Sequence, residues 1–181
     1  MKLCVFGASS DQIDRSYIEA GEALGRAMAL RGHSLVFGGG ATGLMGAAAR
    51  GIHGEGGCSV GIAPTFFDQP GVLYENCSRF VFTETMRQRK ERMEEEADGF
   101  IMTPGGIGTL EEFFEVLTLK QLGRHEKPIG ILNINGYFDN LEQLLKNTAD
   151  CGFMTHDCLQ LYCITDDIEQ LLVYMESFTK E

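Results

Sequence analysis

Basic residues are scarce in this sequence, and long apolar runs are absent. The chain carries 15 Lys and Arg against 26 Asp and Glu, so its formal net charge is -11. A protein that binds nucleic acid broadly needs a basic face to displace counterions, so this balance argues against a nucleic-acid partner. No apolar run approaches the length of a membrane span, and the run at the start of the chain is too short for a secretory signal. We therefore expect a cytoplasmic protein with no membrane partner.

Motifs for metals, disulfide frameworks and ATP are also missing. The six cysteines form no Cys-x-x-Cys pair, and the four histidines lack the spacing of metal ligands. Buried free thiols in a reducing compartment are the simplest interpretation of the cysteines. No Gly-Lys dipeptide occurs, which excludes the phosphate-binding loop of ATPases. The sequence therefore predicts neither a structural metal nor a loop of that type.

Short apolar runs alternate with longer amphipathic segments along all 181 residues, of which 44% are hydrophobic. We predict strands at Lys2–Phe6, Ser34–Phe37, Ser59–Ala63, Arg79–Phe82, Gly99–Met102, Pro128–Asn133 and Leu161–Ile164. Helices are predicted at Tyr17–Arg31, Gly43–His53, Thr85–Glu96, Leu110–Leu122, Tyr137–Asp150 and Asp167–Ser177. Strands that alternate with helices need crossover connections, which favour a parallel sheet. The sequence thus predicts an α/β fold: one Rossmann-like domain over residues 1–181, with a doubly wound parallel sheet and helices on both faces.

Three turns rich in glycine or serine follow predicted strands, at Gly7–Ser10, Gly38–Gly43 and Gly105–Thr109. In doubly wound sheets, ligands bind beside such turns, at the carboxyl ends of the strands. The second turn fits the Gly-x-Gly-x-x-Gly pattern of dinucleotide sites, but the next strand ends without the acid that would hold a ribose. NAD or FAD binding is therefore disfavoured. Close packing of a helix on a strand and contact with a phosphate explain this turn equally well.

The segment Pro104–Glu112 carries the strongest chemical signal. Its glycines leave a strand and enter a helix, where free backbone N–H groups and the helix dipole favour a phosphate. Thr109 can cap this helix or donate its hydroxyl to the same phosphate. Compensation of the helix dipole in the first turn would explain one of the two acids, Glu111 and Glu112. A second acid beside a phosphate loop is costly unless it has a task, which points to catalysis.

A basic cluster precedes this loop in the sequence. It consists of Arg87, Arg89, Lys90 and Arg92, four of the 15 basic residues. Such a concentration in an acidic protein suggests an anionic ligand, whereas the alternative is an exposed helix held by ion pairs with the glutamates at 91–96. We expect both: Arg87 and Arg92 serve surface pairs, while Arg89 and Lys90 face the pocket. Met86 is either part of the core or an apolar bed for a flat base.

These segments together resemble the Lonely Guy family of cytokinin-activating phosphoribohydrolases, which are often mislabelled as lysine decarboxylases. The resemblance rests on Met86–Lys90 followed by Pro104–Glu112, where the family pattern is Arg-Lys and then Pro-Gly-Gly-x-Gly-Thr-x-x-Glu. It extends through Gly38–Gly46 and Gln121–Pro128 and covers most of residues 3–155. Residues 65–78, predicted as an irregular excursion, align poorly with the family. The preferred base therefore stays open.

The resemblance implies a homodimer that releases a free base and ribose 5-phosphate from a nucleoside 5′-monophosphate. It also implies that Arg89 and Glu112 are catalytic. The nucleotide-binding residues expected from the resemblance and from the glycine turns are Ser9, Ser10, Gly39, Gly40, Met86, Lys90, Gly105, Gly106, Gly108, Thr109, Glu111 and Thr118. The match to the family at Ser9 and Ser10 is partial.

The residues agree with chemistry of this kind. Cleavage of an N-glycosidic bond builds positive charge on the ribose, and a carboxylate such as Glu112 can stabilise that charge and orient or deprotonate a water. Arg89 can pair with Glu112 or contact the ribose and phosphate. No organic cofactor is expected, and Lys90 alone gives no case for a pyridoxal-phosphate decarboxylase. A non-catalytic nucleotide or cofactor carrier of the same fold is the alternative.

The predicted helix Leu110–Leu122 is apolar over more than one stripe. Its apolar residues include Phe113, Phe114, Val116, Leu117, Leu119 and Leu122. One sheet face cannot bury so much surface, and a two-fold partner is the usual solution. Alternatively, the helix at 137–150 and the C-terminal helix cover the excess within one subunit.

Overall fold

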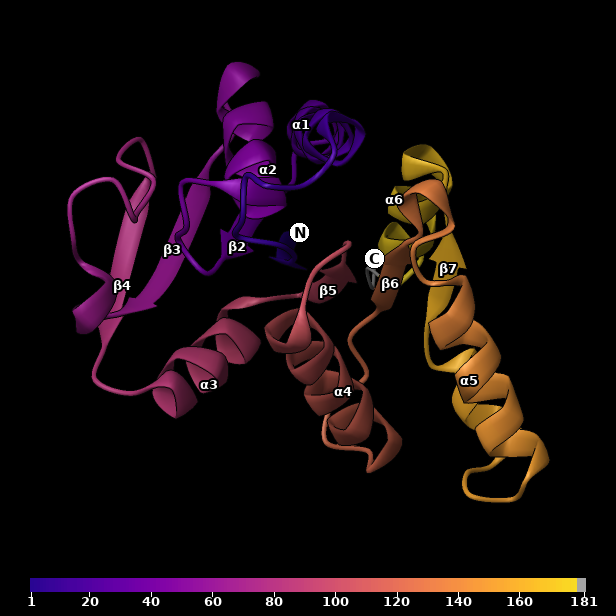
Figure 1. The fold of residues 1–181 in the computed structure, drawn as a ribbon. Helices are drawn as coiled ribbons and strands as arrows, with labels where there is room; N and C mark the ends of the chain where they lie inside the picture. The colour runs from indigo at the N-terminus through magenta and orange to yellow at the C-terminus, as the bar shows by residue number, and fades with distance from the viewer. Residues whose placement is uncertain (179–181) are drawn as a thin grey trace.

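Seven strands form one sheet in the order β4-β3-β2-β1-β5-β6-β7, and every neighbouring pair is parallel (Figure 1). The structure is a computed structural model that describes residues 1–178. The strands are β1 Lys2–Phe6, β2 Ser34–Phe37, β3 Ser59–Pro64, β4 Arg79–Thr83, β5 Gly99–Met102, β6 Ile129–Leu132 and β7 Cys163–Thr165. The chain runs outward from β1 to β4 and then returns to place β5 on the other side of β1. The predicted doubly wound α/β fold is confirmed, and its topological switch point lies between β1 and β5.

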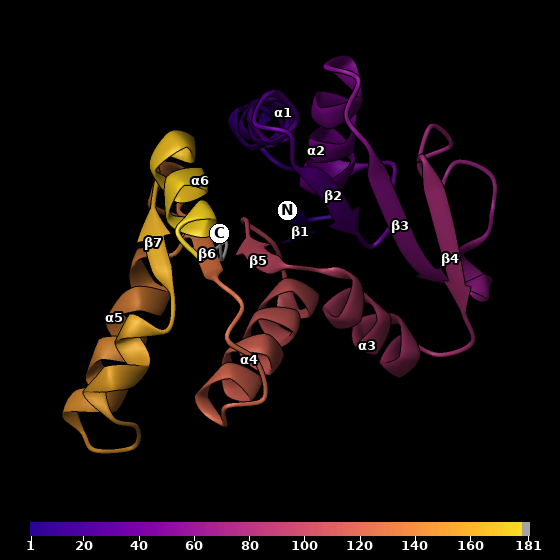
Figure 2. The same ribbon diagram turned by 180° about the vertical axis from the view of Figure 1, so that it is seen from behind.

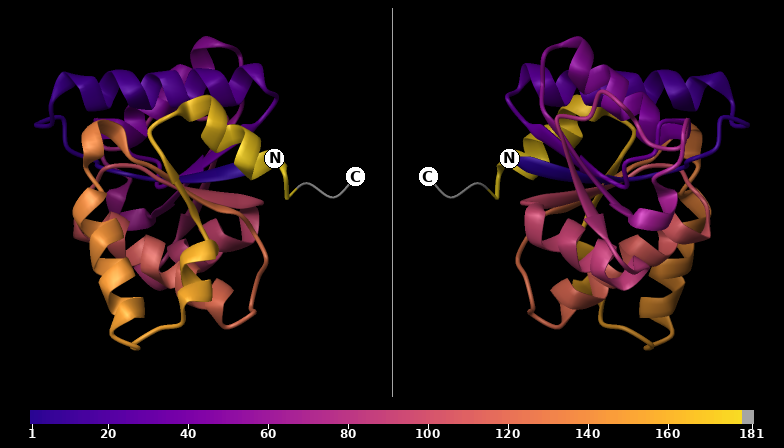
Figure 3. Two further views of the ribbon diagram at one scale, coloured as in Figure 1. Left: turned by 90° about the vertical axis from the view of Figure 1, so that its right-hand side faces the viewer. Right: turned by 90° about the vertical axis from the view of Figure 1, so that its left-hand side faces the viewer.

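Helices cover both faces of this sheet. They are α1 Arg15–Leu30, α2 Gly43–Gly54, α3 Met86–Glu96, α4 Ile107–Gln121, α5 Asp139–Asp150 and α6 Ile168–Glu176. Helices α1, α2 and α6 lie on one face and α3, α4 and α5 on the other, as Figure 2 shows from behind and Figure 3 from the two sides. None of the helices described is long and apolar enough to cross a membrane.

The inner strands are apolar along their length because helices bury both faces of the sheet. Every residue of β5 and β6 is buried. Side chains of β1 alternate between two apolar clusters: Leu3 and Val5 pack with residues of α1, α2 and α6, whereas Cys4 and Phe6 pack with residues of α3 and α4. The core therefore covers both faces of the sheet. The turns at the strand ends are left as the place where a ligand could bind.

Several predicted boundaries differ from the structure. Helix α4 begins at Ile107 and not at Leu110, because helical backbone starts directly after the extended Gly106. The last strand is Cys163–Thr165 and not Leu161–Ile164, because a 3-10 helix at His156–Gln160 and its C-cap Leu161 occupy the preceding residues. The change in α4 matters most, since it moves the acids of this helix away from its first turn.

Residues 65–78, which we call the arm, connect β3 to β4 on the outside of the sheet. They contain a 3-10 turn at Thr65–Phe67 and an isolated antiparallel bridge between Leu73 and Gly40, and are otherwise irregular, as predicted. Backbone hydrogen bonds hold the arm to the glycine turn after β2: Ala41 N donates to Val72 O at 3.0 Å, and Tyr74 N donates to Gly39 O at 2.9 Å. The arm is therefore fastened over the carboxyl end of β2.

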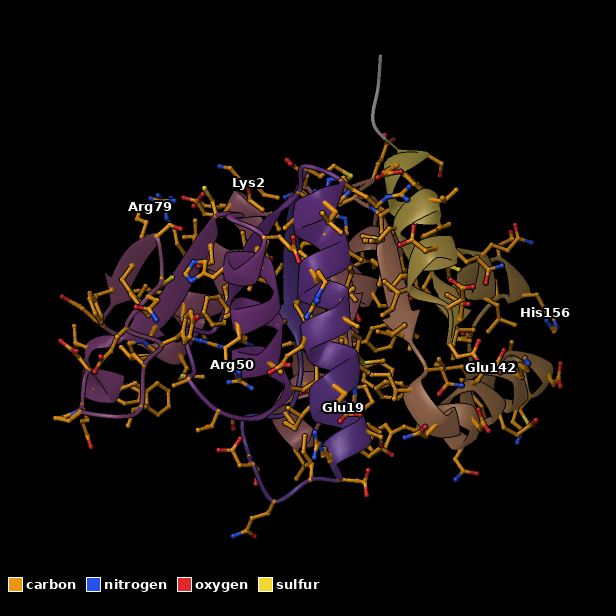
Figure 4. All side chains as sticks on the ribbon, turned by 90° about the horizontal axis from the view of Figure 1, so that it is seen from above. Lys2, Glu19, Arg50, Arg79, Glu142 and His156 are labelled. Atoms are coloured by element: carbon orange, nitrogen blue, oxygen red, sulfur yellow. The ribbon has the colours of Figure 1, made fainter. Side chains whose placement is uncertain are left out.

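Ion pairs link elements at the opposite end of the sheet. The Glu96 carboxylate lies 3.3 Å from the Lys2 ammonium and 2.9 Å from the Arg79 guanidinium. Lys2 and Arg79 begin β1 and β4, and both are labelled along the same side of the molecule in Figure 4. These pairs secure the end of α3 against the amino ends of the strands, away from the glycine turns.

Candidate active site

A cavity of about 550 Å³ opens where the turns leave β1, β2 and β5, beside the switch point. The starts of α3 and α4 form one part of its wall and the arm forms another. A larger hollow of about 950 Å³ lies at the amino ends of the strands, near Lys120 and Lys127. We assign the site to the smaller cavity, because ligands of doubly wound sheets bind at the carboxyl ends of the strands.

Helix α3 brings Arg89 to the cavity. Thr85 caps this helix in a reciprocal arrangement with Gln88, so the helical backbone begins at Met86 and Arg89 follows one turn later. Arg89 is only 7% exposed. Its Nη1 donates to Oε1 of Glu112 at 2.8 Å, and its Nε donates to the carbonyl oxygen of Ile62 at 3.2 Å. Arg89 was expected either to pair with Glu112 or to contact the ribose and phosphate, and in this structure it pairs with Glu112.

The Glu112 carboxyl lies in a poorly solvated position on the cavity wall. Burial raises the pKa of Glu112, because the charged form loses its water, while the charge and hydrogen bond of Arg89 act in the opposite direction. A carboxyl of raised pKa is better matched to accepting and returning a proton near neutral pH. Arg89 keeps an ionised form accessible despite the burial.

The start of α4 faces the same cavity. Gly106 is the N-cap and no side chain caps the helix, so the alternative in which Thr109 acts as the cap is wrong. Thr109 lies in the first turn, is 4% exposed and lines the cavity together with Gly106 and Gly108. The first N–H groups of a helix have no intrahelical partner, so this end of α4 can receive an anion.

Dipole compensation does not explain the two acids of α4. The first turn of the helix contains no acidic residue, because Glu111 and Glu112 follow it. Each acid instead pairs with a basic residue of α3: Glu112 with Arg89, and Glu111 with Lys90. Lys90 also lies 2.8 Å from the carboxylate of Glu115. Helices α3 and α4 are thus joined by two sets of ion pairs, one made by Arg89 and the other by Lys90. Of these, only the Arg89–Glu112 pair lines the cavity.

The remaining basic residues of α3 point to the surface. Arg92 pairs with Glu95 at 2.8 Å and with Glu96 at 3.5 Å, as expected for an exposed helix. Arg87 is exposed and makes no ion pair within the part of the chain that the structure describes. The expected surface pair is therefore confirmed for Arg92 and wrong for Arg87, and of the two residues expected to face the pocket, Arg89 lies on the cavity wall whereas Lys90 does not.

The structure brings eight of the expected site residues together around the cavity. They are Ser9, Gly40, Met86, Arg89, Gly106, Gly108, Thr109 and Glu112. The other expected residues lie outside its lining: Ser10, Gly39, Lys90, Gly105, Glu111 and Thr118. Ser10 is exposed beside Ser9, and Gly105 is buried with its carbonyl oxygen accepting from the Tyr137 hydroxyl at 2.8 Å. Glu111 and Thr118 are exposed on α4 and do not line the cavity.

Sequence reasoning missed the apolar part of the lining. Phe67, Val72 and Leu73 of the arm reach the cavity, as does Met45 of α2. The arm has no strand or helix periodicity from which its position could be predicted. Its hydrogen bonds to the glycine turn hold these side chains beside the site. Gly38 was also missed as a site residue, although the glycine run in which it lies is a visible signal.

The glycine turn after β2 has two roles: one of its glycines packs against the turn after β1, and others line the cavity. Gly43 packs against the turn after β1, where a Cβ would come within 2.4 Å of the carbonyl oxygen of Ala8. Its N–H donates to the carboxylate of Asp11 at 2.7 Å. Gly38 and Gly40 instead line the cavity. The helix-packing explanation therefore holds for Gly43, while the first part of the turn is available to a ligand.

The cavity places this chain among the Rossmann-like α/β proteins that bind small molecules at the switch point of the sheet. Within residues 1–178, no group of three or more His, Cys, Asp or Glu side chains is arranged to hold a metal ion. No lysine lines the cavity in the same part of the chain.

Comparisons with known proteins identify the family. Residues 45–175 match the family model described as "Possible lysine decarboxylase". The probable cytokinin riboside 5′-monophosphate phosphoribohydrolase LOGL5 of Oryza sativa subsp. japonica is 38% identical over 177 residues, which is 98% of this chain and 72% of that protein. Cytokinin riboside 5′-monophosphate phosphoribohydrolase LOG2 of Arabidopsis thaliana is 36% identical over 98% of this chain and 83% of its own length. The chain therefore belongs to this family, the Lonely Guy family that its motifs resemble.

Solved structures agree with the fold. The molybdenum cofactor binding protein of Rippkaea orientalis has a TM-score of 0.74 and 20% identity, with 97% of this chain and 96% of that one covered. The X-ray structure of TM1055 has a TM-score of 0.75 and 23% identity, with 98% of this chain and 100% of that one covered. At such low identity, these likenesses show the fold alone.

Proposed function

We propose that the protein is a nucleoside 5′-monophosphate phosphoribohydrolase, which cleaves the N-glycosidic bond to release a free base and ribose 5-phosphate. The observation that carries this proposal is the buried Arg89–Glu112 pair, which lies on the same cavity wall as the glycine-rich start of α4. A carrier would need the helix start to hold a phosphate, but it would gain little from a buried carboxylate beside it. The activity named for the relatives LOGL5 and LOG2 supports the same reaction.

The phosphate of the nucleotide belongs at the start of α4. Gly106 and Gly108 leave the approach open, since a Cβ built at either position meets no atom within 4 Å. The N–H groups of the first turn and the Thr109 hydroxyl supply donors. Binding energy from this anchor can hold the ribose against Glu112, which is one turn further along α4.

The reaction then requires one water and one carboxylate. The water oxygen forms a bond to C1′ of the ribose while the bond between C1′ and the base nitrogen breaks. The electron pair of the broken C1′–N bond leaves with the base. Glu112 stabilises the positive charge on the ribose and accepts the proton of the attacking water. The base takes up a proton from solvent as it leaves, and Glu112 then releases its proton to solvent. The balance is nucleotide plus water to base plus ribose 5-phosphate. Arg89 orients the carboxylate, and no organic cofactor takes part.

Incubation with AMP, followed by chromatography for free adenine, tests this function. We expect adenine and ribose 5-phosphate in equal amounts. If AMP and every nucleotide of a wider panel bind without turnover, the protein is instead a carrier. The panel includes N6-prenylated AMP, because the apolar Phe67, Val72 and Met86 on the lining could contact a substituent on the base. The panel thereby also identifies the preferred base.

The proposed working unit is a homodimer in which α4 lies at the subunit boundary. Phe113, Val116 and Leu117 are buried within the subunit, yet Phe114 and Leu122 remain 38% and 64% exposed. The alternative was that α5 and the C-terminal helix cover this surface. Phe114 and Leu122 stay exposed although α5 lies on the same face of the sheet as α4, and α6 lies on the other face. Glu111 and Thr118 are exposed on α4 outside the cavity lining, where a partner subunit could bring a nucleotide to them. These observations support the proposed dimer, with a site close to the subunit boundary.

The cytoplasmic location stays a prediction from the sequence. All six cysteines are free thiols, which suits a reducing compartment. Their predicted burial holds for Cys4 and Cys158, whereas Cys58 and Cys151 are exposed.

A further inference from the structure

The guanidinium of Arg89 lies directly beside Gly38, in the space that a side chain at position 38 would fill. Gly38 follows β2 directly, on the floor of the cavity. A Cβ built on Gly38 would lie 2.2 Å from Nη2 of Arg89 and 3.3 Å from its Cζ. Since real Cβ atoms essentially never come within 3.0 Å of another heavy atom in this way, a larger residue would displace the guanidinium. At this position glycine is needed for space.

The two glycines that follow differ in this respect. Gly39 has a φ of +79°, so its backbone conformation itself favours glycine. Gly40 has its nearest foreign atom, Cε of Met45, at 3.5 Å, which is an ordinary contact. The three atoms nearest to the Cβ position of Gly38 all belong to the guanidinium of Arg89. The run of three glycines therefore contains one position dedicated to the guanidinium.

Arg89 cannot yield to a side chain at position 38 without losing a bond. Although Nη2 is the end of a long side chain, this one is 7% exposed and held at two further atoms. Nε donates to the Ile62 carbonyl at 3.2 Å and Nη1 to Glu112 at 2.8 Å. Because the guanidinium is planar and its donors have fixed directions, a shift of Nη2 moves the other two nitrogens as well.

We propose that Gly38 is a positioning residue of the active site, whose missing side chain sets the Arg89 guanidinium against the Glu112 carboxylate. This inference rests on the proposed function, since it assigns Gly38 a part in the same reaction. It differs from the phosphate-contact explanation of the glycine turn, in which Gly38 would act on the ligand directly. The two explanations predict different behaviour when Arg89 is changed.

The first test is Gly38→Ala, with Gly54→Ala as the matched control. Gly54 lies at the end of α2 and has no atom within 4 Å of its Cβ position, so this variant reports the general effect of replacing a glycine. We expect Gly38→Ala to lower kcat on the order of a hundredfold, with a much smaller change in KM, because an error of about 1 Å in a catalytic group has this size of effect. The control keeps the wild-type kcat. A Gly38→Ala enzyme within twofold of wild type would overturn the proposal.

The second test is a double-mutant cycle with Arg89→Lys. The lysine side chain lacks the Nη2 that rests on Gly38, so Gly38→Ala should add little to the loss caused by Arg89→Lys. If Gly38 instead contacts the phosphate, the two losses multiply, and the proposal fails. The cycle also decides the case in which Gly38→Ala does not fold. The double variant with Arg89→Lys should then fold, because the guanidinium that clashes with the new side chain is gone. A double variant that stays unfolded would count against the proposal.

The third test needs no substrate. The pKa of the Glu112 carboxyl, followed by NMR titration of labelled glutamate, should rise in Gly38→Ala, because displaced Arg89 no longer stabilises the charged form. It should not change in Gly54→Ala. If wild-type protein releases no base from any nucleotide, the proposed function fails while this measurement still decides the role of Gly38. An unchanged Glu112 pKa in folded Gly38→Ala would refute that role.

Discussion

At the scale of single residues, Glu112 combines burial with one strong partner. Its side chain has one donor, Nη1 of Arg89, and lies on the wall of the cavity. Lys90 and Glu111, the neighbouring residues on the same two helices, form a pair that is more exposed and outside the cavity. Adjacent positions on two helices thus produce one buried pair on the cavity wall, to which we assign the proposed chemistry, and one more exposed pair that joins the helices.

Glu112→Gln should abolish base release and leave nucleotide binding largely intact. The amide keeps the size of the side chain but can neither accept the proton of a water nor stabilise positive charge on the ribose. We expect kcat to fall on the order of a thousandfold, measured as adenine released from AMP, while the Kd for AMP stays within a few-fold. Glu126→Gln, at an exposed position in the turn after α4, serves as the control. Substantial turnover by a folded Glu112→Gln protein would remove Glu112 from its catalytic role.

At the scale of elements, the start of α4 and the end of α6 have different tasks. The first presents uncapped N–H groups to the cavity. The second fastens the C-terminal helix to the rest of the chain through Glu176. Its carboxylate accepts from Arg31 Nη2 at 2.6 Å and lies 2.9 Å from His33 Nε2. Each end can be tested by itself.

If the start of α4 holds the 5′-phosphate, adenosine should be a far poorer substrate than AMP. Loss of a charge-assisted anchor commonly costs several kcal/mol, so kcat/KM should fall on the order of a hundredfold or more. Initial rates of adenine release from the two compounds under identical conditions provide the measurement. Comparable values of kcat/KM would mean that Gly106–Thr109 has only a packing role.

Glu176→Gln should make the protein less stable at neutral pH and should have a smaller effect in acid. The hydrogen bond from Arg31 and that from His33 lower the pKa of Glu176 from 4.5 to about 2. A carboxyl with a lowered pKa contributes stability that is complete above its unfolded pKa and is lost as pH falls through the folded one. The difference in Tm between wild type and variant should therefore be about 2–4 °C at pH 7 and should shrink between pH 4.5 and about 2.

Thermal unfolding at several pH values, at one protein concentration, measures this difference. Glu169→Gln is the control, since Glu169 also pairs with Arg31 at 2.7 Å but is 66% exposed. Its effect should be small at every pH. A difference for Glu176→Gln that is the same at pH 7 and pH 2.5 would contradict the role given to its charge.

At the scale of the whole molecule, the exposed face of α4 is the contact surface of the proposed dimer. Ile107 and Phe114 lie on it at 88% and 38% exposure, and Leu122 follows at the end of the helix. Glu111 and Thr118 lie between these residues at helical spacing. Burial of this face in a two-fold contact would bring expected binding residues of one subunit close to the other.

We expect light scattering at micromolar protein to report about twice the 19.9 kDa chain mass. Phe114→Asp should produce a monomer with little base-releasing activity, because a charge at the centre of an apolar contact is costly. Leu144→Asp on α5, where the side chain is 58% exposed, should remain dimeric and active. A fully active species at the monomer mass would refute the dimer as the working unit.

The sequence by itself determined the features that depend on local pattern. Alternating apolar runs predicted the strands and the doubly wound sheet, and the glycine turns indicated which edge of the sheet carries the site. The family motifs marked Arg89 and Glu112, because their spacing from the loop Pro104–Thr109 is visible along the chain. These features are visible in sequence since hydrophobic periodicity and turn chemistry act over a few residues.

Only the tertiary structure decided what each marked residue touches. Glu112 and Arg89 are 23 residues apart, and Gly38 is further still from both, so no local pattern shows that one guanidinium contacts Glu112, Ile62 and Gly38. The same holds for Lys90, which pairs with Glu111 and Glu115 outside the cavity lining, and for the arm, which lacks any periodicity. Contacts of this kind depend on how helices α3 and α4 lie across the sheet, and that arrangement is set by the packing of the whole core.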